Sequence, residues 1–232
     1  MRDNIYNSTT DLVDFCFNSE VVKVFDDMVK RSVPGYLNTL ETIRLIAKNY
    51  GKQSTNLYDL GCSTGATATA LNINNHQIIA IDNSISMIEE CQKKFHNFSN
   101  IKFAHNDILN ADIKNASVVV LNLTLQFINK EDRQKLIDKI YNGMVDGGAL
   151  FISEKIHFLD KNHNIFMNNL HLQFKKSNGY SDLEIANKRQ LLENILVTDD
   201  EMTHLNRFKK SGFKNLSIIL QNINFYGFIA IK

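Results

Sequence analysis

Short apolar runs alternate with amphipathic stretches through the middle of the chain. The runs are typical of strands buried on both faces, and the stretches between them repeat apolar residues at helical spacing. The predicted strands are residues 56–60, 77–82, 101–105, 117–122 and 149–154. Because strands that alternate with helices form parallel sheets, this pattern predicts an α/β core over about residues 55–155.

Amphipathic helical patterns lie before, within and after this core. The predicted helices are residues 21–31, 36–50, 84–95, 130–144, 163–176 and 181–196, with a seventh that opens near Thr198. Ser86 with Glu89 and Thr198 with Glu201 stand at capping-box spacing, which marks helix starts. The first two form an N-terminal pair at about residues 20–50, and the last three predict a helical insertion at about 160–212 that covers the site.

Two alternating runs, residues 214–221 and 224–231, close the chain. They are separated by two residues only, so they predict an antiparallel hairpin at about 213–232. The predicted architecture is a Rossmann-like, mostly parallel seven-stranded sheet with a C-terminal antiparallel hairpin. With a single proline, Pro34, and no low-complexity segment to mark a linker, residues 1–232 are expected to form one domain.

Composition excludes several classes of function. Lysine and arginine total 26 against 25 aspartate and glutamate without a block of either sign, so no direct nucleic-acid binding is expected. Cys16, Cys62 and Cys91 lack CxxC spacing, and no histidine pair stands with an acid at ligand spacing, so no disulfide and no metal are predicted. A polar N-terminus and the lack of a bilayer-length apolar run favour a cytoplasmic protein without a membrane partner.

Candidate chemistry begins where the first predicted strand ends, in the turn YDLGCSTG at residues 58–65. Ligands of open parallel sheets bind at the carboxyl ends of strands, so a nucleotide-like cofactor is expected here, although a tight turn without a ligand is the alternative. Asp82 ends the next strand, 23 positions after Asp59. At that spacing a carboxylate meets the two hydroxyls of a ribose, which makes Asp82 the strongest candidate.

The spacing of this turn distinguishes between cofactors. A dinucleotide fingerprint requires G-x-G-x-x-G, whereas this turn has Gly61, Ser63 and then Gly65 one place too early. It resembles the acidic-x-G-x-G-x-G turn of class I S-adenosylmethionine-dependent methyltransferases, with Ser63 replacing the middle glycine. The resemblance implies a class I methyltransferase fold and S-adenosyl-L-methionine as the cofactor.

Other strand ends supply weaker candidates. Asp107 with Ile108 offers an acceptor beside an apolar wall for adenine, although Asp107 also suits a plain loop. Asn122 suits a ligand amine or carboxylate, and equally a cap for the next turn. Cys62 is interpreted as a small loop residue, since no histidine lies near it to activate a thiolate. Solvated or capping roles are expected for the scattered histidines, His171 among them.

Nearly the whole chain is similar to the bacterial carboxy-S-adenosyl-L-methionine synthases. The similarity lies in RSVPGY (31–36), YDLGCS (58–63), AIDNS (80–84), VVLNLTLQF (119–127), GGA (147–149), SEK (153–155), NGY (178–180), KR (188–189) and LEN (192–194). The chain departs from the family at Asn106, where a glycine is common, at Asp146, where a proline is usual, and in a shorter N-terminal tail. None of these departures removes a predicted site residue.

This resemblance implies a site and a reaction. The residues that would hold the cofactor are Tyr36, Gly61, Cys62, Ser63, Asp82, Asn83, Asp107, Ile108 and Asn122, and Arg189 would hold the product carboxylate as the catalytic cation. Prephenate would give phenylpyruvate while its carbon dioxide is captured on the methyl carbon of S-adenosyl-L-methionine, forming the carboxy-S-adenosyl-L-methionine used in wobble-uridine modification of tRNA. A homodimer is also implied. A conventional S-adenosylmethionine-dependent methyltransferase acting on a small molecule or RNA, and a non-catalytic binding module, remain the alternatives.

Overall fold

The computed structural model describes residues 2–3, 19–192 and 195–232. Cys16 lies outside the described residues. So do positions 193 and 194, which belong to the predicted helix 181–196 and to the LEN stretch. The helices are α1 Ser19–Ser32, α2 Tyr36–Tyr50, α3 Ala66–Leu71, α4 Ile85–Lys94, α5 Lys130–Gly143, α6 Lys161–Ser177, α7 Asp182–Leu192 and α8 Glu201–Ser211. The strands are β1 Asn56–Leu60, β2 Gln77–Asp82, β3 Ile101–His105, β4 Ala116–Asn122, β5 Met144–Lys155, β6 Asn215–Asn222 and β7 Phe225–Ile231.

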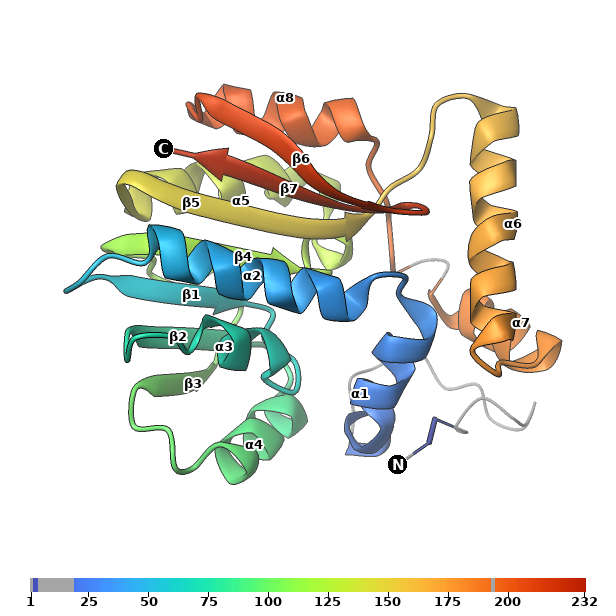
Figure 1. The fold of residues 1–232 in the computed structure, drawn as a ribbon, viewed down its shortest axis with the longest axis horizontal. Coiled ribbons are helices and arrows are strands. Elements are labelled where there is room, and N and C mark those ends of the chain that lie inside the picture. Colours follow the sequence, from blue (N-terminus) through green and yellow to red (C-terminus); the bar gives the residue numbers. More distant parts are fainter. Residues whose placement is uncertain (1, 4–18, 193–194) are drawn as a thin grey trace.

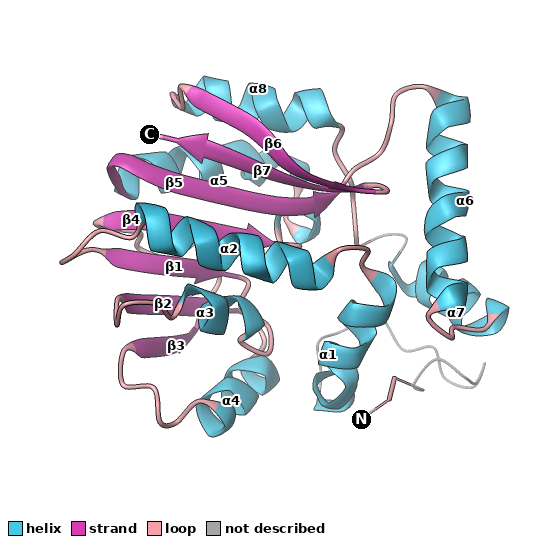
Figure 2. Cartoon of the chain, viewed as in Figure 1, coloured by secondary structure: helices cyan, strands magenta, loops and turns pink. Residues whose placement is uncertain are grey.

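The seven strands form one sheet in the order β3-β2-β1-β4-β5-β7-β6. Strands β1 to β5 run parallel, and β7 pairs antiparallel with both β5 and β6 (Figure 2). The predicted fold is therefore confirmed, including the terminal hairpin. The strand order reverses between β1 and β4, which places a topological switch point at their carboxyl ends.

Helices cover both faces of this sheet. On one face α2, α3 and α4 pack against the strands, with Ile43 and Ala68 among their buried side chains. On the other face α5 packs its buried Leu136 and Ile140 together with α8. Figure 1 shows α2 and α3 in front of the sheet and α5 and α8 behind it, whereas α1, α6 and α7 lie beyond the carboxyl ends of the parallel strands. These last three helices are placed to cover a ligand at the switch point.

Three local predictions are wrong in detail. Strand β5 begins at Met144, earlier than predicted, because Met144 pairs with Ala116 before a register shift and the strand continues through Gly147. Helix α4 is capped by Ser84, whose hydroxyl accepts the backbone N–H of Met87, and not by Ser86. Helix α8 is capped in the same way by Asp200. No described helix is long and apolar enough to cross a membrane.

Candidate active site

A cavity of about 810 Å³ opens at the carboxyl ends of β1 and β4. The ends of β2, β3 and β5, helices α1, α6 and α7 and the segment after β4 also contribute to its wall. All ten residues predicted for the site line this one cavity: Tyr36, Gly61, Cys62, Ser63, Asp82, Asn83, Asp107, Ile108, Asn122 and Arg189. Residues separated by up to 153 positions thus share one space (189 − 36).

The backbone of the turn after β1 packs closely against neighbouring segments. Gly61 has φ +83°, and a Cβ at this position would lie 2.4 Å from Oγ1 of Thr124. Only glycine combines that conformation with that space. Its N–H donates to the carbonyl of Ile81 at 2.8 Å, and the N–H of Cys62 donates to the same oxygen at 3.0 Å. The turn is therefore held against the end of β2, where Asp82 stands.

Asp82 lies at the end of β2 with its carboxylate fixed by two backbone donors. The N–H of Ser63 donates to Oδ2 and the N–H of Ser84 to Oδ1, each at 2.9 Å. Burial raises the pKa of Asp82, while these two donors act to lower it. A carboxylate oxygen can accept more than one hydrogen bond. Both oxygens can therefore also accept from a diol, which fits the ribose of an adenosine.

Asn122 presents an unpaired acceptor to the cavity. Its Nδ2 donates to Oγ1 of Thr67 at 3.0 Å, whereas its buried Oδ1 has no hydrogen-bond partner among the described residues. A buried acceptor left unpaired costs roughly 1–3 kcal/mol, so this position suits a ligand donor such as an ammonium group. The contact with Thr67 ties the side chain to the first turn of α3, and because no described backbone N–H donates to Oδ1, Asn122 does not act as a cap. These residues fit S-adenosyl-L-methionine.

The remaining predicted positions differ in burial. Asp107 accepts the N–H of Leu109 at 2.8 Å, which is what a plain loop aspartate does, and Ile108 beside it is buried. Tyr36 begins α2 and is buried, so desolvation, helped by the charges of Asp26 and Asp59, raises its pKa above the usual value. Tyr36 therefore lines the cavity as a neutral phenol.

Cys62 and His171 also line the cavity. A hydrogen bond with Cys91 and burial both raise the pKa of Cys62, which keeps this thiol protonated and agrees with a small loop residue. Of the two roles expected for His171, the solvated one is wrong and the capping one is confirmed, because the ring contacts the last residue of α1. This ring is buried and its Nε2 lies 2.8 Å from the carbonyl oxygen of Ser32. Burial and the charges of Lys175 and Lys155 lower its pKa to about 3.

Three lysines that sequence reasoning missed also line the cavity. Lys155 ends β5, Lys175 lies on α6 and Lys188 precedes Arg189 on α7. Arg189 is exposed at the cavity, and its side chain makes no hydrogen bond or ion pair with another described residue. A signal for Lys155 was present, since it follows a buried strand at the same sheet edge as Asn122. Helical lysines carry no such signal, because most of them face solvent.

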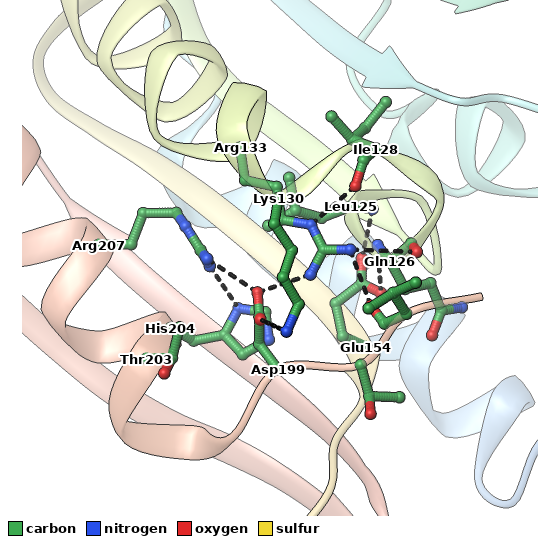
Figure 3. Close-up of polar contacts among 12 residues, drawn as sticks. Leu125, Gln126, Ile128, Lys130, Arg133, Glu154, Asp199, Thr203, His204 and Arg207 are labelled. Carbon is green, nitrogen blue, oxygen red and sulfur yellow. Dashed lines mark hydrogen bonds and ion pairs between the residues drawn. The ribbon is translucent and has the colours of Figure 1, made fainter. Parts of the chain in front are cut away.

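The segment after β4 is positioned by two buried polar side chains (Figure 3). Glu154 accepts the backbone N–H groups of Thr124, Leu125 and Gln126 at 3.0, 2.7 and 3.2 Å. Burial raises the pKa of Glu154 to about 8, against these donors and the charge of Arg133. Arg133 donates in turn to the carbonyl of Ile128. Glu154 and Arg133 thereby hold the cavity wall at residues 123–128 from behind.

Comparison with known proteins identifies the family. A methyltransferase domain family matches residues 57–148. A carboxy-S-adenosyl-L-methionine synthase of Ruthia magnifica is 52% identical over 237 residues, with 100% of both chains covered. The synthase of Photorhabdus laumondii is 43% identical over 239 residues, covering 100% of this chain and 95% of its own. This chain belongs to the carboxy-S-adenosyl-L-methionine synthase family.

The fold of this synthase family member is shared with more distant enzymes. Human N-acetylserotonin methyltransferase, in complex with S-adenosylmethionine, superposes with a TM-score of 0.64 at 15% identity. The superposition covers 92% of this chain and 55% of the longer human chain. At that identity it shows the class I methyltransferase fold alone.

Two stretches that carry the resemblance to the synthases meet in space. Arg31 on α1 donates from Nε to the carbonyl of Asn178 and from Nη2 to that of Gly179, each at 2.8 Å. Its guanidinium lies 4.0 Å from the ring centroid of Tyr180, within range of a cation–π contact. The RSVPGY stretch thereby contacts the NGY stretch. This contact joins α1 to the turn between α6 and α7. These contacts position the helices that cover the cavity.

Proposed function

We propose that this protein converts S-adenosyl-L-methionine and prephenate to carboxy-S-adenosyl-L-methionine, phenylpyruvate and water, for the modification of wobble uridine in tRNA. One observation of the structure carries the proposal beyond family membership. The cavity that contains the cofactor residues also contains four cationic side chains: Lys155, Lys175, Lys188 and Arg189. Carboxyl transfer involves anions throughout, because the substrate is a dicarboxylate and the product gains a carboxylate.

Residues at different strand ends would bind different parts of the cofactor. Asp82 would accept the ribose hydroxyls, and Asp107 with Ile108 would lie beside the adenine. Asn122 would accept from the amino group through its unpaired Oδ1. The close-packed backbone of residues 61–63 would let the ligand approach the turn. Tyr36 and Asn83 would complete this part of the wall.

The protein's chemical contribution is mainly electrostatic. The sulfonium of the bound cofactor acidifies its methyl group, which would lose a proton and add carbon dioxide, while that proton and the hydroxide that leaves prephenate would make the water. Arg189 would hold the new carboxylate, since its planar fork can pair both oxygens at once. Helices α1, α6 and α7 would limit the access of water, which strengthens charge interactions inside the site. No nucleophile is required, consistent with the protonated state of Cys62.

Product analysis tests this proposal. Purified protein with S-adenosyl-L-methionine and prephenate should form phenylpyruvate and a cofactor heavier by one carboxylate in place of a hydrogen. Mass spectrometry of the small-molecule fraction detects both products. A conventional methyltransferase would form S-adenosylhomocysteine instead, and methylated nucleosides after addition of tRNA would contradict the proposal. A homodimer, a cytoplasmic location and the absence of direct nucleic-acid binding, expected from the sequence, stay predictions.

A further inference from the structure

Two lysines of the cavity lack a counter-charge. Lys155 and Lys175 are both half-buried, and neither side chain forms an ion pair or hydrogen bond within the described residues. Placing an ammonium group in such surroundings is costly unless an anion accompanies it. Lys188, which is buried, lies 3.5 Å from Oδ2 of Asp3 and 3.3 Å from the hydroxyl of Tyr180. Within the described residues, Lys155 and Lys175 are therefore the members of the cluster that no acidic side chain balances.

The cations of this cluster affect one another. Burial, followed by the charges of Lys155, Lys188 and Arg189, lowers the pKa of Lys175 to about 7. Burial and the charge of Arg189 likewise lower the pKa of Lys155. An anion bound in the cavity among these groups would interact favourably with each of them. Their positions on β5, α6 and α7 bring them together from three different elements.

Apolar side chains lie next to these charges. Leu172 stands one helical turn from Lys175 on α6, and Ile185 stands one turn from Lys188 on α7. Both line the cavity, as does Phe225, whose ring centroid lies 5.0 Å from that of the buried His171. A six-membered carbon ring with a charged side chain matches this combination. A free inorganic anion would pair with the lysines but would leave the apolar side chains exposed to water.

We infer that Lys155, Lys175 and Lys188 form a subsite for the carboxylate of the substrate's oxo-acid side chain, the carboxylate that survives in phenylpyruvate. This inference rests on the proposed function. The other carboxylate of the substrate leaves as neutral carbon dioxide when its bond to the ring breaks. A cluster of cations around that group would stabilise the ionised ground state and oppose its loss. The lysines therefore hold the retained carboxylate, and Arg189 is left to pair with the carboxylate that forms on the cofactor.

Titration of lysine variants tests the subsite. The variants are Lys155→Gln and Lys175→Gln, with Lys175→Arg to restore the charge. Lys176→Gln is the matched control, because Lys176 is the next residue on α6 but is exposed and paired with Asp182 at 2.5 Å. The protein is first saturated with S-adenosylhomocysteine, which lacks the methyl group and prevents turnover. Prephenate and phenylpyruvate are then titrated separately by calorimetry, and wild-type product formation is measured in parallel.

Each glutamine variant should bind both prephenate and phenylpyruvate about tenfold or more weakly, because a charged hydrogen bond is lost. Binding of S-adenosylhomocysteine, and both titrations of Lys176→Gln, should change less than about twofold. Lys175→Arg should recover part of the affinity. The thermal midpoint of the unliganded glutamine variants should not fall, since a poorly compensated charge is removed.

Three results would overturn the subsite. Unchanged affinity for both ligands would make the lysines bystanders. Loss of prephenate binding without loss of phenylpyruvate binding would assign them to the departing carboxylate. Equal weakening toward S-adenosylhomocysteine would assign them to the methionine carboxylate of the cofactor. In all three cases the wild type would still make carboxy-S-adenosyl-L-methionine, whereas a wild type that makes none and binds no prephenate would contradict the proposed function itself.

Discussion

Asp82 shows how one side chain can carry a ligand site. Its two oxygens accept backbone donors from Ser63 and Ser84, so the carboxylate is already oriented before a ribose arrives. Replacement by alanine should cost on the order of 1.5–3 kcal/mol in binding of S-adenosyl-L-methionine, which is tenfold or more in affinity. Calorimetric titration measures the change. Unchanged affinity in a folded Asp82→Ala variant would mean that the ribose lies elsewhere.

Arg189 is expected to act selectively between two forms of the cofactor. Its assigned partner is the carboxylate of the product, which S-adenosyl-L-methionine lacks. Because the side chain is exposed at the cavity, Arg189→Leu should weaken binding of carboxy-S-adenosyl-L-methionine by about tenfold, less than for a fully desolvated pair, and leave S-adenosyl-L-methionine nearly unchanged. Paired titrations with both forms measure this difference. Equal weakening toward both would make Arg189 a structural residue.

The lysine cluster should make substrate binding depend on pH. The pKa values of Lys175 and Lys188 are lowered to about 7 and about 8, chiefly by burial, and Lys155 and Arg189 face Lys175. His171, with a pKa of about 3, stays neutral. An anion favours the charged lysines, so prephenate affinity should fall as the pH rises through 7 and 8. Calorimetry at pH 8 in buffers of different ionisation enthalpy should show proton uptake on binding.

Stability of the unliganded protein should respond in the opposite direction. Because the usual lysine pKa of 10.5 applies to the unfolded chain, that chain takes up a proton before the folded protein does. The contribution of Lys175 to the free energy of unfolding is therefore complete above pH 10.5 and is lost as the pH falls through about 7. Lys175→Gln should reduce this slope, and an unchanged slope would show that Lys175 is ordinary in its titration.

At the scale of elements, the segment between β4 and α5 depends on a residue from the neighbouring strand. Glu154 on β5 is 1% exposed and accepts three backbone N–H groups from this segment. Glu154→Gln replaces one acceptor oxygen by a donor that faces those N–H groups. The free energy of unfolding should fall by about 2–4 kcal/mol, as expected for buried donors left unpaired. Urea denaturation measures it, with the exposed Glu89→Gln on α4 as the control.

Asp199 completes the support of that segment from a third element. It lies just before α8 and pairs with Arg133 at 2.7 Å and with Arg207 at 2.8 Å (Figure 3). Arg133 also donates to the carbonyls of Gln126 and Val197. The start of α8 is thereby connected to the wall of the cavity through buried ion pairs and hydrogen bonds.

For the whole molecule, Arg31 joins parts of the chain that cover the cavity. This side chain joins α1 to the turn that carries Asn178 and Gly179, although 147 positions separate Arg31 from Asn178. Arg31→Leu should increase hydrogen exchange in α6 and α7 while β1 to β5 exchange as in the wild type, because the sheet makes none of these contacts. Mass spectrometry of exchanged peptides tests this. Arg31→Lys should recover little, since a point charge cannot pair two carbonyls in the same geometry.

Loss of the Arg31 contacts should also weaken ligands unequally. The proposed lysine subsite lies on α6 and α7 as well as β5, whereas Asp82, the proposed ribose position, belongs to the sheet. Prephenate should therefore lose more affinity than S-adenosylhomocysteine in Arg31→Leu. Unchanged exchange and unchanged binding together would show that the cover is positioned without Arg31.

The amino-acid sequence by itself determined the sheet and the cofactor turn. Strand and helix periodicities are local, so the strands can be located from the sequence. Because the carboxyl ends of parallel strands meet at one edge, the sequence also predicts that Gly61, Asp82 and Asn122 lie close together. Similarity to the synthases, and not any spacing, identified Tyr36 and Arg189. The local rules failed at helix caps and at the start of β5, where competing polar side chains and a register shift decided the boundary.

Only the tertiary structure decided how the cavity is charged and covered. Lys155, Lys175 and Lys188 come from separate elements, and nothing in the local sequence of the two helical lysines distinguishes them from solvated lysines. His171 and Glu154 likewise became buried through packing against distant segments. Burial and charge interactions depend on which elements meet after folding, and these long-range contacts leave no period in the sequence.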